Sequence, residues 1–168
     1  MAEISKIFFG GEYYHSLDEK GRVLLPGPHR IMLAISCSPN LFYLGYLPGT
    51  SFLNLYTREK FESILLEWDN QDRFSSTQEY MDAKRLFFSK IDPVEPDKAG
   101  RILIPQKFRD WLGLTKDLVI AGARDKIEIW NLETYKKYEK EAEIRLATKI
   151  NSLLDSPEVA PGARFPSW

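Results

Sequence analysis

A nine-residue motif occurs twice in this chain, and its repetition restricts the possible folds more than any other feature. DEKGRVLLP at residues 18–26 aligns without gaps with DKAGRILIP at residues 97–105, which lie 79 positions later. Farther along, residues 54–61 match residues 128–135 at an offset of 74, so the intervening loop is five residues longer in the first copy. The repetition indicates two similar modules in tandem.

Each copy predicts the same short series of β elements. The motif glycines, Gly21 and Gly100, suit a tight turn because glycine takes a positive φ at no side-chain cost. The apolar runs at 23–25 and 102–104 are too short for a helix and predict buried strands that end at the following prolines. We expect a hairpin to follow in each copy, formed by residues 41–44 with 52–56 and by residues 118–120 with 126–130.

Proline placement distinguishes the two copies. Pro105 can serve as the first residue of a short helix, because the missing N–H of a proline costs nothing there. The first copy carries Pro-Gly-Pro at residues 26–28, which predicts a poorer helix start. Pro96 is expected to lie in the strand that approaches the second turn, where its missing N–H removes a β-ladder donor and predicts an edge position or a bulge.

Other helices are expected between the copies and after them. Thr57 can cap the first of these helices, and Ser76 with Glu79 forms a capping box for a helix that links the copies. After Asn131, apolar residues at steps of three and four predict a longer amphipathic helix. Residues 155–168 contain three prolines and are expected to be disordered or to be ordered by a partner.

The charge and cysteine counts restrict the classes of function. The 168 residues hold 23 Lys and Arg against 24 Asp and Glu, a net charge of −1. This balance disfavours a monomer that binds nucleic acid through its overall net charge. The single cysteine, Cys37, excludes an internal disulfide, and with only His15 and His29 beside it the chain has too few ligands for structural zinc. We expect no metal and no cofactor.

Nothing in the sequence predicts a membrane segment or a targeting signal. The apolar run near the N-terminus spans only residues 7–9. A secretory signal needs an apolar run of about 7–15 residues, and a spanning helix needs about 20. We therefore expect a soluble protein of the cytoplasm.

Three segments of the chain, FGGEYYHSLDEKGR at residues 9–22 and the stretches at 97–109 and 127–130, carry a resemblance to a known family. The first closely resembles the opening of the MraZ family of bacterial transcriptional regulators, and the other two are similar to its later motifs. The resemblance covers roughly residues 9–140. It implies an α+β, β-rich fold, in which two tandem swapped-hairpin SpoVT-AbrB modules form a pseudo-symmetric double-split barrel with flanking helices.

The same resemblance implies a domain organisation and a function. The expected parts are module 1 at 12–59, linking helices at 60–87, module 2 at 88–132, a C-terminal helix at 133–154 and the tail at 155–168. Family members are expected to form ring-like homo-oligomers, associated with the nucleoid, that bind repeated short boxes in double-stranded DNA. The resemblance implies that those boxes lie upstream of the division and cell-wall gene cluster, and that binding represses the protein's own operon.

By resemblance, the family's site residues fall within the two turns. The expected DNA-binding residues are Lys20, Arg22, Lys98 and Arg101, and the residues that shape the motif are Asp18, Gly21, Asp97 and Gly100. The second copy departs from the first because its lysine directly follows the aspartate, and Ala99 stands at the position of Lys20. Arginine can pair bidentately with guanine O6 and N7, whereas nearby lysines would mainly contact phosphates.

The residues themselves leave alternatives open for the arginines. Arg22 and Arg101 either contact DNA or form internal salt bridges with the aspartates of the motif. Arg30 and Arg109 are related by the same offset of 79 and are expected to be solvated or to lie at an interface.

Two other classes of function compete with DNA binding. Asp92, Glu95 and Asp97 crowd together and could hold Mg²⁺. However, the sequence contains no glycine-rich phosphate loop, nucleophile elbow or HExxH pattern, so we expect no enzyme. A structural or protein-interaction ring would need the arginine turns only for assembly. Charge reversal at the turns would dissociate such a ring, whereas a DNA binder would lose affinity and stay assembled.

Overall fold

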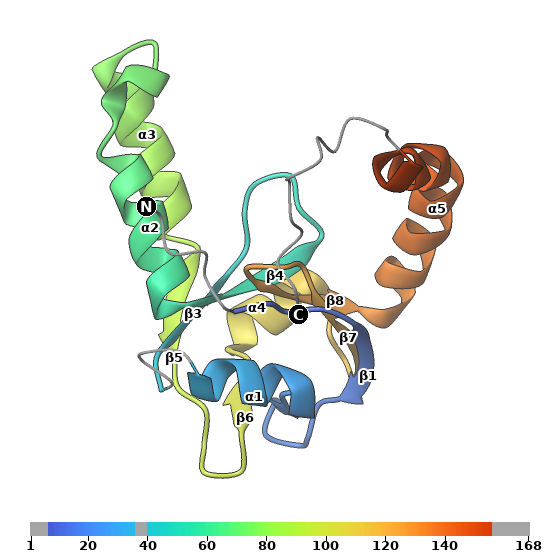
Figure 1. Cartoon of the computed structure of the whole chain (residues 1–168). Coiled ribbons are helices and arrows are strands. Elements are labelled where there is room, and N and C mark those ends of the chain that lie inside the picture. Colours follow the sequence, from blue (N-terminus) through green and yellow to red (C-terminus); the bar gives the residue numbers. More distant parts are fainter. Residues whose placement is uncertain (1–6, 36–39, 156–168) are drawn as a thin grey trace. The chain divides into compact units, whose positions relative to one another are not determined.

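The computed structural model describes residues 7–35 and 40–155 (Figure 1). The strands are β1 (Glu12–Ser16), β2 (Arg22–Leu24), β3 (Phe42–Gly45), β4 (Phe52–Thr57), β5 (Ile91–Val94), β6 (Arg101–Leu103), β7 (Asp117–Gly122) and β8 (Ile127–Asn131). The helices are α1 (Gly27–Ile35), α2 (Arg58–Trp68), the 3-10 turn η1 (Gln71–Arg73), α3 (Thr77–Phe88), α4 (Gln106–Leu112) and α5 (Leu132–Asp155). The α+β, strand-rich fold class is confirmed.

The chain divides into two compact units between Leu132 and Glu133. The first unit contains β1–β8 and α1–α4, and the second contains the α5 helix from Glu133 onward. The expected helix after Asn131 is confirmed and extends to Asp155. The expectations for Cys37 and for the tail beyond Asp155 lie outside the described residues.

Strands from the two copies are interleaved within the sheets of the first unit. Six antiparallel strands form one sheet in the order β1-β7-β8-β4-β3-β5, and β2 pairs with β6 in a separate two-stranded ribbon. The expected hairpins are confirmed as β3–β4 and β7–β8. Each copy also pairs with the other, through β1–β7, β4–β8, β3–β5 and β2–β6.

The β2–β6 ribbon joins equivalent positions of the repeat. Val23 lies opposite Ile102 in its antiparallel register. Beyond the strand ends, Leu25 N donates to Gly100 O at 3.1 Å, and Ile104 N donates to Gly21 O at 3.0 Å. Because these contacts are reciprocal, an approximate two-fold axis passes between Val23 and Ile102.

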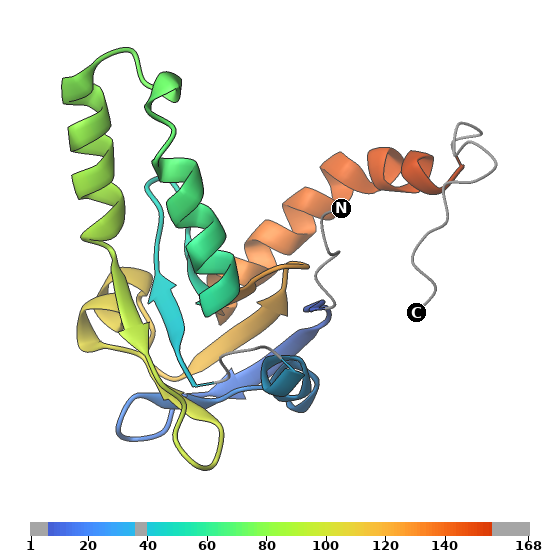
Figure 2. The ribbon, with the colours of Figure 1, turned by 60° about the vertical axis from the view of Figure 1, so that its left-hand side comes forward.

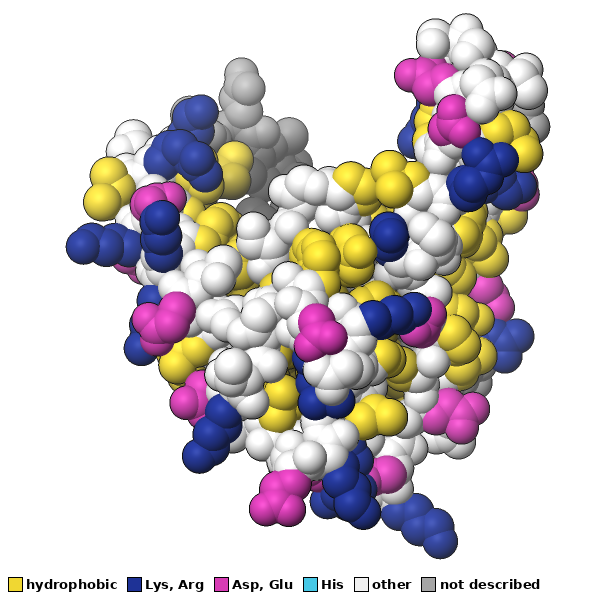
Figure 3. Space-filling model, turned by 180° about the vertical axis from the view of Figure 1, so that it is seen from behind, with side chains coloured by type: hydrophobic (Ala, Val, Ile, Leu, Met, Phe, Trp, Pro, Cys, Tyr) yellow, Lys and Arg dark blue, Asp and Glu magenta, His cyan; other side chains and the backbone are white. Residues whose placement is uncertain are grey.

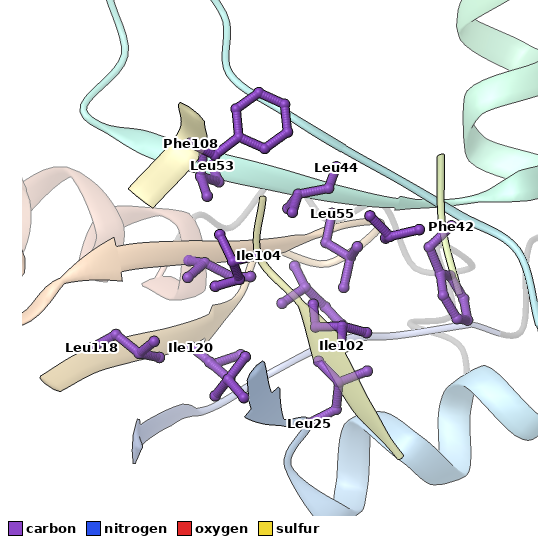
Figure 4. Close-up of a cluster of buried hydrophobic side chains, with 14 of the residues drawn as sticks. Leu25, Phe42, Leu44, Leu53, Leu55, Ile102, Ile104, Phe108, Leu118 and Ile120 are labelled. Atoms are coloured by element: carbon purple, nitrogen blue, oxygen red, sulfur yellow. The ribbon is translucent and has the colours of Figure 1, made fainter. Parts of the chain in front are cut away.

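The core lies between the large sheet and the β2–β6 ribbon, as the labelled side chains in Figure 4 show. Both copies contribute apolar side chains that are at most 1% exposed: Leu25, Phe42, Leu44, Leu53, Leu55, Ile102, Ile104, Phe108, Leu118 and Ile120. Burial of a leucine, isoleucine or phenylalanine side chain contributes about 1.5–3 kcal/mol. The shared core therefore stabilises both copies together.

Helices α2 and α3 follow β4 and precede β5 in the chain, and they form a pair that projects from the sheet (Figure 2). The predicted caps are confirmed: Thr57 Oγ1 accepts from Lys60 N at 3.2 Å, and Ser76 Oγ accepts from Glu79 N at 3.1 Å. In a capping box the Glu79 carboxylate would accept from the backbone N–H of Ser76. Here it accepts instead from Ser75 N, one residue earlier, at 2.6 Å.

The expectation of a poorer helix in the first copy is wrong. Helix α1 has nine residues, whereas its counterpart α4 has seven. Pro28 lies in the first turn of α1, where backbone N–H groups have no intrahelical acceptor, so the proline costs little. Helix α4 ends where Gly113 takes the left-handed conformation at φ 65°.

The expectation that Pro96 lies within a strand is also wrong. Pro96 lies between β5 and β6, and Pro93 is the proline inside a strand. Strand β5 is at the edge of the large sheet, where the missing N–H of Pro93 leaves no ladder partner unsatisfied.

Candidate nucleic-acid interface

The two copies of the motif form turns that lie side by side at one end of the first unit (Figure 2). In the first turn, Gly21 N donates to Asp18 O at 2.9 Å and Asp18 N donates to Arg22 O at 2.8 Å. The second turn repeats both bonds at the same distances, with Asp97, Gly100 and Arg101. The motif glycines have φ of 78° and 81°, which confirms the positive φ predicted for them.

Each aspartate organises its own turn through its side chain. Asp18 Oδ1 accepts from the backbone N–H groups of Lys20 and Arg22, both at 2.9 Å. Asp97 Oδ1 accepts from Ala99 N at 2.9 Å and from Arg101 N at 3.0 Å. These hydrogen bonds favour the ionised carboxylate and give the aspartates a structural role.

The arginines form ion pairs with both aspartates. Arg22 Nε lies 2.7 Å from Asp18 Oδ2, and Arg101 Nε lies 2.8 Å from Asp97 Oδ2. Across the two-fold axis, Arg22 Nη1 lies 3.6 Å from Asp97 Oδ2, and Arg101 Nη1 lies 4.0 Å from Asp18 Oδ2. The internal salt bridge that the sequence left open is therefore present, and it links the two copies.

The hydrogen bonds lower the pKa of both carboxyl groups. The largest cause for Asp18 is the backbone N–H of Arg22; desolvation acts in the opposite direction, and the hydrogen bond from the Arg22 guanidinium lowers the pKa further. The pKa of Asp97 is lowered in the same way by the backbone and side chain of Arg101. Both aspartates are therefore ionised at neutral pH and hold their arginines in place.

Two further arginines lie against the turns, and sequence reasoning did not place them there. A β-carbon built on Gly21 would lie 2.5 Å from Arg109 Cζ, and one built on Gly100 would lie 2.7 Å from Arg30 Cδ. Arg109 of the second copy therefore lies on Gly21 in the first copy's turn, and Arg30 of the first copy lies on Gly100 in the second copy's turn. Arg109 is also fixed by its Nε, which donates to Ile104 O at 3.0 Å. The shared offset of 79 was the available sign that these arginines belong to the motif.

Six basic side chains consequently gather at one end of the first unit. They are Lys20, Arg22, Arg30, Lys98, Arg101 and Arg109. Both lysines are exposed, and the side chains of Arg22 and Arg101 retain 27% and 37% of their accessible surface. Figure 3 shows Lys and Arg side chains at this lower end, with acidic side chains among them. The arrangement supplies local positive charge on a chain of almost neutral net charge.

Two of the three carboxylates in the rival magnesium hypothesis, Asp92 and Asp97, have cationic partners. Asp92 pairs with Lys107 Nζ at 2.7 Å, and Asp97 pairs with the turn arginines. Within residues 7–35 and 40–155, no three His, Cys, Asp or Glu side chains group as a metal site.

His29 is 1% exposed, its Nε2 lies 2.9 Å from Gly10 O, and burial lowers its pKa, so it packs as a neutral ring.

Similarity to known proteins decides the family. Residues 87–156 match the family model described as MraZ protein. The chain is 41% identical over 143 residues to Transcriptional regulator MraZ of Dictyoglomus turgidum, a match that covers 81% of this chain and 88% of that protein. The chain belongs to the MraZ family.

Other MraZ relatives match over a similar extent. The Transcriptional regulator MraZ of Mycoplasmoides gallisepticum is 34% identical over 148 residues, which covers 88% of this chain and 96% of that protein. The Transcriptional regulator MraZ of Dictyoglomus thermophilum is 39% identical over 143 residues, which covers 81% of this chain and 88% of that protein. These matches confirm the resemblance that the repeated motif predicted. Among the helices of the described segments, none is both long and apolar enough to cross a membrane.

Proposed function

We propose that this MraZ chain is a sequence-specific, DNA-binding transcriptional regulator whose two turns contact the duplex together. The observation that carries the proposal is the reciprocal pairing of the turns, which collects basic side chains from both copies on one end. Binding of double-stranded DNA depends on such local concentrations of Lys and Arg. The relatives' names, Transcriptional regulator MraZ, support the same function.

The contacts of the turn arginines are compatible with base recognition. A guanidinium carries five N–H donors, and Arg22 commits Nε to its short bond with Asp18. The terminal nitrogens carry the other four donors and would pair with guanine O6 and N7, although Nη1 also lies 3.6 Å from Asp97 Oδ2. The aspartates hold each arginine in one orientation before DNA arrives, which reduces the entropy lost on binding. Lys20 and Lys98 would contact phosphates and position the ribbon in the major groove.

The proposal includes the domain organisation expected from the sequence. Modules 12–59 and 88–132 would be swapped-hairpin SpoVT-AbrB units that form a double-split barrel, with linking helices at 60–87. The pairing of β1 with β7 and of β4 with β8 supports this exchange. The C-terminal helix would occupy 133–154 and precede the tail at 155–168.

We further propose that several copies act together on DNA. A ring-like homo-oligomer would place many turn pairs along repeated upstream boxes, and multivalency would compensate for the near-neutral charge of one chain. The target would be the chain's own division and cell-wall operon, which it would repress while associated with the nucleoid. No cofactor or catalytic residue takes part.

A competition assay tests specific binding. DNA from upstream of the chain's own gene competes with a scrambled duplex of equal length for the intact protein, and Arg22→Ala/Arg101→Ala is compared with wild type. We expect a preference for the upstream DNA and a loss of about 1–3 kcal/mol for each base contact removed. Arg85→Ala, which changes an exposed arginine on α3, is the control. Equal binding of both duplexes by wild type would instead favour a structural or protein-interaction ring.

A further inference from the structure

Two exposed leucines lie between the arginines on the outer face of the β2–β6 ribbon. Val23 and Ile102 point toward the core and are 1% and 0% exposed. Because side chains alternate along a strand, the neighbouring residues occupy the opposite face. That outer face consists of Arg22, Leu24, Arg101 and Leu103. Leu24 is 39% exposed and Leu103 is 50% exposed.

The register gives these four side chains a symmetric arrangement. Leu103 lies opposite Arg22, and Leu24 lies opposite Arg101. Side chains in such directly opposed positions have Cβ atoms about 5 Å apart, and diagonal neighbours such as the two leucines lie about 7–8 Å apart. That diagonal spacing is close to two base-pair steps of B-DNA, at about 3.4 Å each.

The surroundings of the leucines point to DNA as their occupant. Each leucine has an arginine opposite it, and the lysines and remaining arginines of the two turns lie beside the ribbon. This charge complements a polyanion, and a two-stranded ribbon fits the major groove. In that groove the C5 methyl group of thymine is the apolar group that base edges present, and small apolar contacts to it distinguish thymine.

We propose that Leu24 and Leu103 are specificity residues that contact thymine methyl groups. The preferred DNA then contains thymine at two positions about two base-pair steps apart. This inference rests on the proposed DNA-binding function and adds a readout that the arginines do not supply. The arginines select guanine through hydrogen bonds, and the leucines select thymine through apolar contact.

Replacement of thymine by uracil tests the inference, because uracil lacks only the C5 methyl group. A duplex is selected with the wild-type protein from a random-sequence library and synthesised with thymine or with deoxyuridine. We expect wild type to bind the uracil duplex about fourfold more weakly for each methyl group that a leucine would otherwise touch. Leu24→Ala/Leu103→Ala is expected to bind both duplexes with equal affinity.

Two controls separate the leucines from other causes. Leu66→Ala changes a leucine on α2 that is 72% exposed, and this variant should discriminate between the duplexes as wild type does. An effect of uracil on DNA shape would persist in the double leucine variant, so its loss there assigns the effect to the leucines. Far-UV circular dichroism and light scattering check that the double variant keeps its fold and its mass.

Several results would overturn the inference. Equal affinity of wild type for both duplexes would contradict methyl recognition while leaving DNA binding intact. Discrimination that survives in the double leucine variant would assign it to other residues. A changed mass of that variant would place the leucines at a contact between copies. A failure of wild type to enrich any sequence from the library would overturn the proposed function as well.

Discussion

The aspartates of the repeated motif act at the scale of single residues by fixing both backbone and arginine. Asp18 accepts two backbone N–H groups and one guanidinium N–H, and Asp97 does the same in the second turn. A carboxylate with several hydrogen bonds is more acidic in the folded state than in the unfolded chain. The free energy of unfolding therefore depends on pH through these two residues.

The sign of that dependence gives a first prediction. Because the folded pKa of each carboxyl is lowered, its stabilising contribution is complete above the unfolded value of about 3.9. That contribution is lost as the pH falls through the folded pKa. Urea unfolding should therefore show decreasing stability below about pH 4. Asp18→Asn/Asp97→Asn should be less stable at pH 7 and should respond less to acid. Asp82→Asn, an exposed control on α3, should retain the wild-type acid response.

A second prediction concerns Gly21, which has a positive φ and carries Arg109 on its face. Gly49 is a matched control because its φ is 82° and a β-carbon added there would have no heavy atom within 4 Å. Gly49→Ala should cost about 1–2 kcal/mol from the backbone conformation alone. Gly21→Ala should cost more and should also weaken DNA binding, because the methyl group displaces the guanidinium. Equal effects of the two substitutions on stability and DNA affinity would contradict this account.

Sequence reasoning predicted the residues whose roles are local. The turn glycines, the aspartates and the Thr57 cap depend on neighbours within four positions, and the structure has them as expected. The positions of Arg30 and Arg109 depend on the other copy's turn, about 70 to 90 residues away in sequence. A repeat establishes that two residues are equivalent, but it does not establish which surface each one contacts.

At the scale of elements, the two turns differ in charge although their backbones match. Glu19 in the first turn occupies the position of Lys98 in the second. The first turn therefore has two acidic and two basic residues, whereas the second has one acidic and two basic residues. The second turn should attract phosphates more strongly.

That asymmetry gives a third prediction. Glu19→Lys should raise DNA affinity and make the slope of log K against log salt steeper by about 0.9, the value for one phosphate contact. The measurement is a salt titration of binding by fluorescence anisotropy. Glu62→Lys makes the same charge change on the exposed surface of α2 and should leave the slope unchanged. A steeper slope in both variants would show that overall charge, rather than the turn, determines the effect.

The helices that follow the turns show where element prediction failed. The Pro-Gly-Pro sequence predicted a weak helix, yet α1 is longer than α4. Its proline lies where the helix needs no donor. His29 and Leu33 are the buried residues of α1, and the His29 ring contacts Tyr13 of β1. Local propensity was overridden by tertiary packing.

At the scale of the whole molecule, the interleaved strands of the two copies form one compact unit up to Leu132. Sequence patterns identified the hairpins but not their partners, because alternation of apolar residues defines a strand and not the strand beside it. The pairing of β4 with β8 and of β3 with β5 thus came from the structure.

Cooperative unfolding of the first unit is the fourth prediction. Ile102 is 0% exposed at the centre of the β2–β6 ribbon, so Ile102→Ala should cost about 2–5 kcal/mol. Hydrogen exchange should accelerate together in the β3–β4 hairpin of the first copy and the β7–β8 hairpin of the second. Acceleration confined to β7–β8 would show that the copies unfold independently.

The central claim is that both turns lie on DNA at the same time, and photo-crosslinking tests it most directly. A p-benzoylphenylalanine residue replaces Lys20, Lys98 or, as the control, Lys84, which lies on α3. Each protein is irradiated with the upstream duplex under conditions where binding is complete. We predict crosslinks to DNA from positions 20 and 98 and none from position 84. Crosslinking from only one of the two turns, or from neither, would contradict the account.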